Sequence, residues 1–73
     1  MRITVKPAGI IKRFITEQEM DVPVGLTSRA LIRDLRIPAE LKMISLVNGT
    51  RRGLDDALEE GDEVRLVTLL TGG

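Results

Sequence analysis

The stretch DVPVGLTSRALIRDLRIP, residues 21–38, decides the fold, because the spacing of the apolar residues changes within it. Before Gly25, apolar and polar residues alternate, as they do in a strand with one buried face. After Thr27, whose side-chain oxygen suits the start of a helix, Leu31 and Leu35 lie four residues apart. The stretch therefore predicts the end of a strand and then a short amphipathic helix. The helix should end before the closing proline, which disfavours the helical conformation in the residue that precedes it.

On the N-terminal side of this stretch, the pattern predicts an antiparallel hairpin. Apolar side chains alternate with polar ones in residues 1–6, which is typical of a half-buried strand. A second alternating run, residues 13–25, follows a break at residues 7–9 and places Phe14 and Val24 on the apolar side. Two such runs joined by a short segment with glycine and proline indicate a hairpin.

On the C-terminal side, the pattern predicts further strands. A third strand in residues 41–53 ends at Asn48 and Gly49, a pair typical of tight hairpin turns, and residues 51–52 would form a very short fourth strand. The last strand is expected in residues 63–70. A hairpin, a helix and further strands in this order predict an α+β fold, with a small mixed sheet and one helix packed across it.

The alternation also separates a core from an outer face. Side chains on the apolar side of the strands and helix are expected to be buried together. The expected core consists of Met1, Ile3, Val5, Phe14, Leu31, Leu35, Val47, Val64 and Leu66. One helix covers only one face of a sheet, yet the opposite face of the third and last strands is apolar as well. We expect an exposed patch there, at which a partner protein docks. Its residues, called the sheet patch below, are Ile44, Leu46, Val67 and Leu69.

Length and composition narrow the classes of function. The 73 residues suffice for one domain, residues 1–73, and they include no cysteine and no histidine. Disulfides, thiolate metal sites and the commonest general base are therefore excluded. The 11 basic residues balance the 11 acidic ones, which argues against nucleic acid as a partner. The sequence has no apolar run long enough to span a membrane and no signal peptide, so we expect a cytoplasmic protein without a membrane partner.

Three local features could indicate a metal site, a phosphate-binding surface or a catalytic nucleophile, but each has a simpler structural explanation. The acidic run in residues 55–63 lacks the ligand order of a calcium loop and is expected to be a solvated loop. The three arginines of residues 29–36 are expected on the wet face of the helix. Ser28 and Ser45 have no histidine to activate them. We therefore expect neither catalysis by this chain nor a bound metal or cofactor.

The sequence closes on Gly72 and Gly73, directly after an apolar strand. A terminal carboxylate is ionised at neutral pH and can attack the α-phosphate of ATP, which gives an acyl-adenylate open to sulfur or amine nucleophiles. Glycines allow close approach of the backbone, and four extended residues reach about 13 Å, enough to enter a deep cleft. We expect Gly73 to be the reactive residue. The residues expected to thread into a partner's active site are Leu70, Thr71 and Gly72.

These features together resemble the MoaD/ThiS family of sulfur carrier proteins, which have the β-grasp, ubiquitin-like fold. The matching segments are residues 21–38, LVNG at 46–49, LDDALEEGDEVRLV at 54–67 and the two closing glycines. The resemblance implies a carrier and not an enzyme. A ubiquitin-activating-type adenylyltransferase would activate Gly73 with ATP and magnesium, which belong to that partner. Sulfur would then be installed as a thiocarboxylate and donated to the large subunit of an accepting synthase.

The resemblance leaves alternatives for the pathway. In the molybdenum-cofactor branch, the tail inserts into the large subunit of molybdopterin synthase, and in the thiamine branch it feeds the thiazole synthase. Lys6 and Pro7 replace the turn that thiamine carriers often have after the first strand, so the resemblance favours the molybdopterin side. The same activated tail could instead be joined to lysines of target proteins, as that of ubiquitin is. A third alternative is a passive β-grasp module that binds RNA or a protein.

Overall fold

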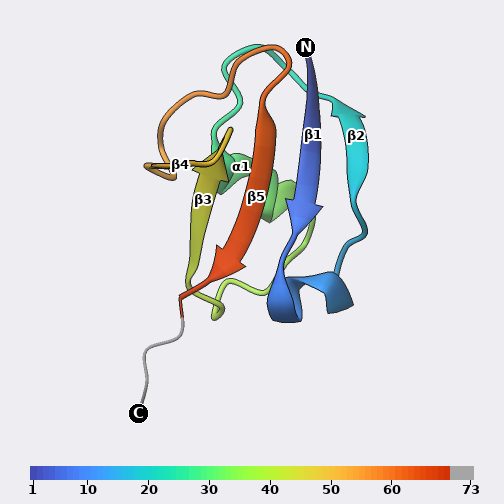
Figure 1. Cartoon of the computed structure of the whole chain (residues 1–73), viewed down its shortest axis with the longest axis vertical. Helices are drawn as coiled ribbons and strands as arrows, with labels where there is room; N and C mark the ends of the chain where they lie inside the picture. The colour runs from blue at the N-terminus through green and yellow to red at the C-terminus, as the bar shows by residue number, and fades with distance from the viewer. Residues whose placement is uncertain (70–73) are drawn as a thin grey trace.

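The computed structural model describes residues 1–69, which form one sheet, one α-helix and one short 3-10 helix (Figure 1). The elements in chain order are β1 (Arg2–Pro7), η1 (Gly9–Arg13), β2 (Gln18–Asp21), α1 (Ser28–Asp34), β3 (Met43–Val47), β4 (Thr50–Arg52) and β5 (Glu63–Thr68). The strand order across the sheet is β2-β1-β5-β3-β4. The central pair, β1 and β5, is parallel, whereas the pairs β1–β2, β3–β5 and β3–β4 are antiparallel. The predicted mixed sheet is confirmed.

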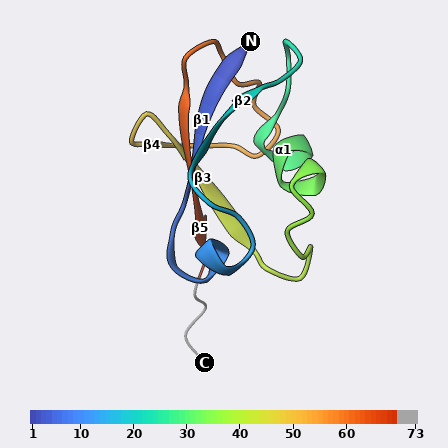
Figure 2. The ribbon, with the colours of Figure 1, turned by 90° about the vertical axis from the view of Figure 1, so that its right-hand side faces the viewer.

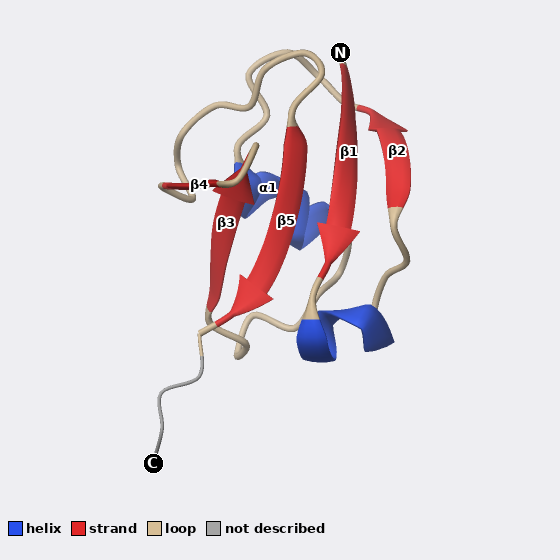
Figure 3. Cartoon of the chain, in the orientation of Figure 1, coloured by secondary structure: helices blue, strands red, loops and turns tan. Residues whose placement is uncertain are grey.

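The helix α1 lies across one face of the sheet (Figures 2 and 3). Buried side chains of the helix, the strands and the connecting segments form the core. Val5 and Val64 are opposite each other on the parallel central strands, and both are fully buried. The expected core residues that are buried are Ile3, Val5, Leu31, Val47, Val64 and Leu66. Met1 and Leu35 are half-buried and pack against this core. Buried apolar residues that the sequence pattern did not select are Ile11, Ile15, Val22, Ile37, Met43 and Leu58.

The placement of Phe14 in the core is wrong, and the cause is a helical turn where a strand was expected. The segment that begins with η1 continues to Ile15, whose backbone N–H donates to the Ile11 C=O at 3.2 Å. In a helical turn, residues four apart share a side. Ile11 and Ile15 therefore face the core, whereas Ile10 and Phe14, each 44% exposed, face away from it.

The second strand is also shorter than its alternating pattern. The strand β2 ends at Asp21, and the Val22 N–H still donates to the Met1 C=O at 2.7 Å. Pro23 follows and has no N–H with which to continue the ladder. Val24, which was predicted on the apolar side, is consequently 88% exposed.

The start of α1 is fixed by the predicted cap. The Thr27 hydroxyl accepts a hydrogen bond from the Ala30 N–H at 3.2 Å, which satisfies one of the free donors of the first turn. Leu31 is fully buried, and Arg29 and Arg33 lie on the exposed side as expected. The helix is thereby held with its apolar side on the sheet.

The turn between β3 and β4 has the predicted form. Asn48 and Gly49 both have positive φ angles, 52° and 86°, as the two central residues of a type I′ turn require. The Asn48 side chain also reaches the loop before β5, where its amide donates to Asp62 at 2.9 Å and its oxygen accepts from the Glu63 N–H at 2.9 Å. The turn therefore also anchors the start of β5.

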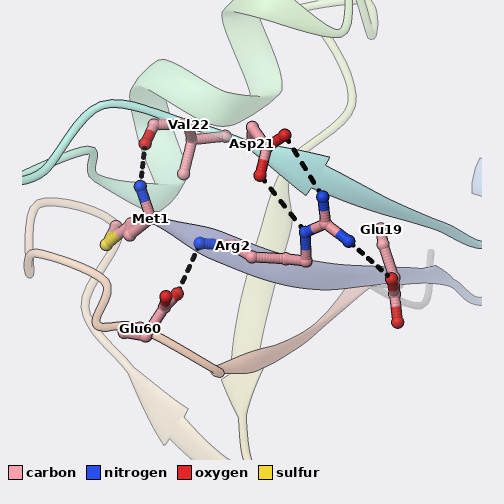
Figure 4. Close-up of polar contacts among 6 residues, drawn as sticks. All are labelled: Met1, Arg2, Glu19, Asp21, Val22 and Glu60. Carbon is pink, nitrogen blue, oxygen red and sulfur yellow. Dashed lines mark hydrogen bonds and ion pairs between the residues drawn. The ribbon is translucent and has the colours of Figure 1, made fainter.

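The edge formed by β1 and β2 is held by contacts at the N-terminal end of the chain (Figure 4). The Met1 ammonium group donates to the Val22 C=O at 2.8 Å. The Arg2 guanidinium pairs with Asp21 at 3.2 Å and with Glu19 at 3.5 Å, both on β2. The Arg2 backbone N–H donates to Glu60 of the acidic loop. This end of the sheet is therefore joined to both β2 and the loop.

Candidate functional site

The outer face of the sheet presents the predicted sheet patch. Ile44 of β3 lies directly opposite Val67 of β5, so their side chains share the face away from α1. Both are half-buried, whereas their neighbours Ser45 and Leu66 are fully buried under the helix. The predicted parity of both strands is confirmed.

The other two members of the sheet patch extend it in opposite directions. Leu46 is half-buried and lies opposite Arg65 of β5. The charged side chain of Arg65 therefore lies between Leu46 and strand β1. The Leu69 N–H donates to the Lys42 C=O at 2.8 Å, which continues the ladder one residue past β5. With 44% of its surface exposed, Leu69 is the most accessible member of the patch. The patch is therefore a band along β3 and β5 that is most open at the C-terminal end of β5.

Charged side chains border this band on the β1 side. Lys6 of β1 pairs with Glu63 of β5 at 2.8 Å across the parallel strands. The hydrogen bond and the positive charge of Lys6 lower the pKa of the Glu63 carboxyl from its ordinary value, and Glu63 in turn raises the pKa of Lys6. Arg65 lies directly opposite both Lys6 on β1 and Leu46 on β3. An apolar band with a charged border is the usual composition of a protein-docking surface.

The residues expected to react and to thread, 70–73, lie outside the described residues. The strand β5 leads toward them, and Leu69 is the last residue before them. The structure therefore places the sheet patch next to the predicted reactive segment in the chain. The roles of Gly73, Gly72, Thr71 and Leu70 stay predictions.

Two exposed apolar residues near this end of the molecule were missed by the sequence analysis. Ile10 and Phe14 belong to the segment around η1, which packs against β5 and lies at the end of the sheet where β5 finishes (Figure 1). Their four-residue spacing, repeated by Ile11 and Ile15, was the signal of a helical turn. These side chains add exposed apolar surface at this end of the sheet.

The carboxylates of the acidic loop before β5 form hydrogen bonds and an ion pair that hold the loop in place. The Asp56 carboxylate accepts from the Gly53 N–H at 3.0 Å, and Asp62 accepts from the Glu59 N–H at 2.8 Å. Asp55 pairs with Arg29 at 2.7 Å. Within residues 1–69, no three acidic side chains are grouped so that they could hold a metal ion. These carboxylates close turns and connect the loop to α1.

The two serines considered as nucleophiles bond to each other. The Ser28 and Ser45 hydroxyls are 2.9 Å apart, and both side chains are fully buried between α1 and β3. This position, away from solvent, is that of a structural contact.

In the described part of the chain, no helix has the length and apolar character needed to cross a bilayer.

Comparison with solved structures defines the class of fold as β-grasp, ubiquitin-like. The chain is similar to SAMP1 from Haloferax volcanii, with a TM-score of 0.75 and 18% identity over 100% of both chains. It is also similar to a putative molybdopterin converting factor, subunit 1, from Pyrococcus furiosus, with a TM-score of 0.75 and 20% identity over 94% of this chain and 98% of that one. A third match is small archaeal modifier protein 1 of H. volcanii, with a TM-score of 0.72 and 17% identity over 89% and 93%.

These likenesses are structural, and at such identities they establish the fold. No protein-family model matches the chain, and no curated protein matches it by sequence. The fold predicted from the sequence is therefore confirmed, and the function rests on the arguments that follow.

Proposed function

We propose that this protein is a sulfur carrier in molybdenum cofactor biosynthesis. A ubiquitin-activating-type adenylyltransferase binds the sheet patch and receives residues 70–73. The Gly73 carboxylate attacks the α-phosphate of ATP, and pyrophosphate leaves. Hydrosulfide supplied by the activating system then attacks the acyl carbon of the adenylate, and AMP and a proton leave, which yields a thiocarboxylate. The large subunit of the accepting synthase takes the sulfur from it.

The observation that carries this proposal is the continuity between the sheet patch and the predicted reactive segment. Leu69, the most exposed member of the patch, directly precedes residues 70–73. A partner that binds the patch would therefore hold its active site close to Gly73. The likeness to a protein described as a putative molybdopterin converting factor, subunit 1, supports this pathway among the sulfur-transfer branches.

The chemistry is tested by the intact mass of the protein isolated from its own host. We expect a fraction of the chain to carry one sulfur in place of one oxygen, and to lose this mass difference after alkylation and hydrolysis of the thiocarboxylate. A variant with one residue appended after Gly73 is the control, because it keeps the fold and blocks the carboxylate. An appended variant that gained the same mass would contradict the proposal.

The docking role of the patch is tested by Leu69→Glu and Leu46→Glu. Each places a charge in the apolar band, and we expect binding to the adenylyltransferase, measured by calorimetry, to weaken by about 2 kcal/mol or more. Val24→Glu is the matched control, because Val24 is an exposed apolar residue outside the patch and should bind normally. Equal binding by all three variants would remove the patch from the interface.

The likeness to two structures of small archaeal modifiers favours a second candidate, in which Gly73 is joined to lysines of target proteins. Digestion with trypsin distinguishes protein modification from sulfur transfer. Arg65 is the last basic residue, so a digested conjugate would carry residues 66–73 on the modified lysine. Such branched peptides in a digest of host proteins would establish modification, and their absence together with the thiocarboxylate would favour the carrier.

A further inference from the structure

A second apolar surface, on the opposite side of β3 from β5, has no part in the function proposed above. It is a groove between α1, the segment that leads into β3, and the loop after β4. The hollow on the helix side measures about 430 Å³. Its apolar lining, called the edge groove below, consists of Ile32, Ile37, Ala39, Leu41, Met43 and Leu54. A second hollow of about 440 Å³ shares Met43 and Leu54 with it and continues toward Gly53.

The backbone along this groove has an open hydrogen-bonding position. The strand β4 pairs with β3 only from Ser45 to Val47. Neighbouring residues of a strand direct their main-chain groups to opposite sides, and the Lys42 C=O accepts from Leu69 on the β5 side. The Met43 N–H and C=O therefore point to the β4 side, beyond the end of that strand. Among residues 1–69 they have no hydrogen-bond partner.

The border of the groove is positively charged. The charged residues that line the two hollows are all basic: Arg29, Arg33, Lys42, Arg51 and Arg52. Arg29 and Arg52 are paired with acidic residues of the following loop, and Arg33 is paired with its neighbour Asp34. Lys42 and Arg51 are exposed and form no ion pair within the described part of the chain. A ligand at this groove would therefore meet uncompensated positive charge.

We propose that the edge groove binds an extended, acidic segment of a partner protein as an added strand beside Met43. An incoming strand would form main-chain hydrogen bonds with the open N–H and C=O, which supply affinity without regard to sequence. Its side chains would point alternately to the two faces of the sheet. Those on the helix side would enter the apolar hollow, so apolar residues fit there. Those on the other side would lie near Arg51, so acidic residues fit there.

This site is independent of the thiocarboxylate chemistry. The side chain of Met43 is buried on the helix side of β3, whereas that of Ile44 is on the outer face, where it belongs to the sheet patch and also lines the second hollow. The helix side of the edge groove is therefore separate from the sheet patch, and the second hollow adjoins the patch at Ile44. A partner on the helix side of the groove would therefore leave Val67, Leu69 and residues 70–73 to a second partner.

The test uses the full chain labelled with ¹⁵N and a capped heptapeptide in which isoleucine and glutamate alternate. We expect shifts of backbone amide signals at Met43, Leu54 and Ile32 as the peptide is titrated at low salt. The charge-reversed variants Lys42→Glu and Arg51→Glu should each weaken binding about tenfold in dissociation constant. Arg13→Glu, an exposed cation outside the groove, should bind as the unaltered chain does. The dispersion of the same spectra shows that each variant is folded.

Two N-methylated peptides test strand addition itself. Methyl groups on alternate amides block either the edge that faces Met43 or the edge that faces solvent. One peptide of the pair should lose binding and the other should keep it. Equal binding by both peptides, or by a peptide with lysine in place of glutamate, would overturn the proposal.

Three further outcomes would each overturn the proposal that the edge groove binds an acidic strand. Signal changes confined to the sheet patch or to β2 would place the peptide elsewhere and overturn the edge groove as its site. Binding of a single-stranded oligonucleotide but not of the acidic peptide would show that the cations serve a nucleic acid. No signal change at about millimolar peptide would also overturn the proposal, since that concentration detects even weak binding.

Discussion

At the scale of single residues, Arg36 occupies a position that favours glycine. It follows the last turn of α1 with a φ of 59°, in the left-handed region. Its N–H donates to the Arg33 C=O at 3.0 Å, and the Ile37 N–H donates to the Ile32 C=O at 3.3 Å. These two bonds form a Schellman motif, which ends the helix before Pro38 is reached. The helix therefore ends through this motif and not through Pro38, and Arg36 lies past the helix and not on its exposed face; both predictions from the sequence were wrong.

We expect Arg36→Gly to raise the free energy of unfolding by about 1 kcal/mol, because glycine adopts this conformation without the steric cost of a Cβ. Urea denaturation measures the change. Arg36→Ala is the control, since it removes the guanidinium but keeps the strain, and it should give no gain. If both variants gained equally, the charge and not the backbone would be responsible.

At the scale of elements, the contact between α1 and the sheet includes one buried polar pair. The Ser28 and Ser45 hydroxyls satisfy each other at 2.9 Å in an otherwise apolar layer. A buried hydroxyl without a partner is costly, so each serine depends on the other. The pair therefore favours one position of α1 over β3.

We expect Ser28→Ala or Ser45→Ala alone to lower the free energy of unfolding by about 1–3 kcal/mol, since each leaves one buried hydroxyl unpaired. The double variant should cost less than either single one, because it removes both polar groups. A thermodynamic cycle of urea denaturation curves gives the coupling between them. Additive costs would show that the two hydroxyls do not depend on each other.

At the scale of the whole molecule, three ion pairs, two of them exposed and one half-buried, connect segments that are far apart in the sequence. Arg2–Asp21 joins β1 to β2, Lys6–Glu63 joins β1 to β5, and Arg29–Asp55 joins α1 to the acidic loop. In each pair, the side-chain hydrogen bond and the positive charge of the basic partner lower the pKa of the carboxyl group. Each carboxyl group therefore stabilises the fold when it is ionised.

A carboxyl group with a lowered pKa in the folded state contributes stability above its unfolded pKa and loses it as the pH falls through the folded pKa. We therefore expect the urea midpoint to be constant above about pH 5 and to fall below about pH 4, where unfolded carboxyl groups take up protons. Denaturation curves from pH 7 to pH 3 measure this.

The control for this pH dependence is Arg29→Gln, which removes one basic partner and should make the acid-induced loss smaller. High salt should also reduce the loss, because exposed pairs are screened. A midpoint that rises on acidification would contradict the assignment of these pairs.

Features that depend on a few neighbouring residues could be predicted from the amino-acid sequence. The cap at Thr27, the turn at Asn48 and Gly49, and the two faces of β3 and β5 were all predicted, because hydrogen bonds and side-chain alternation over short distances fix them. The sheet patch could be predicted for the same reason, since alternation assigns its members to one face.

Features that require contact with a distant part of the chain could not be predicted in this way. Ile11 and Ile15, and not Phe14, became core because the segment around η1 folds as a helical turn against β5. The edge groove likewise exists only where α1, the start of β3 and the loop at Leu54 meet. Local spacing says which side chains share a face, but packing between segments far apart in the chain decides which face is covered and which hollow stays open.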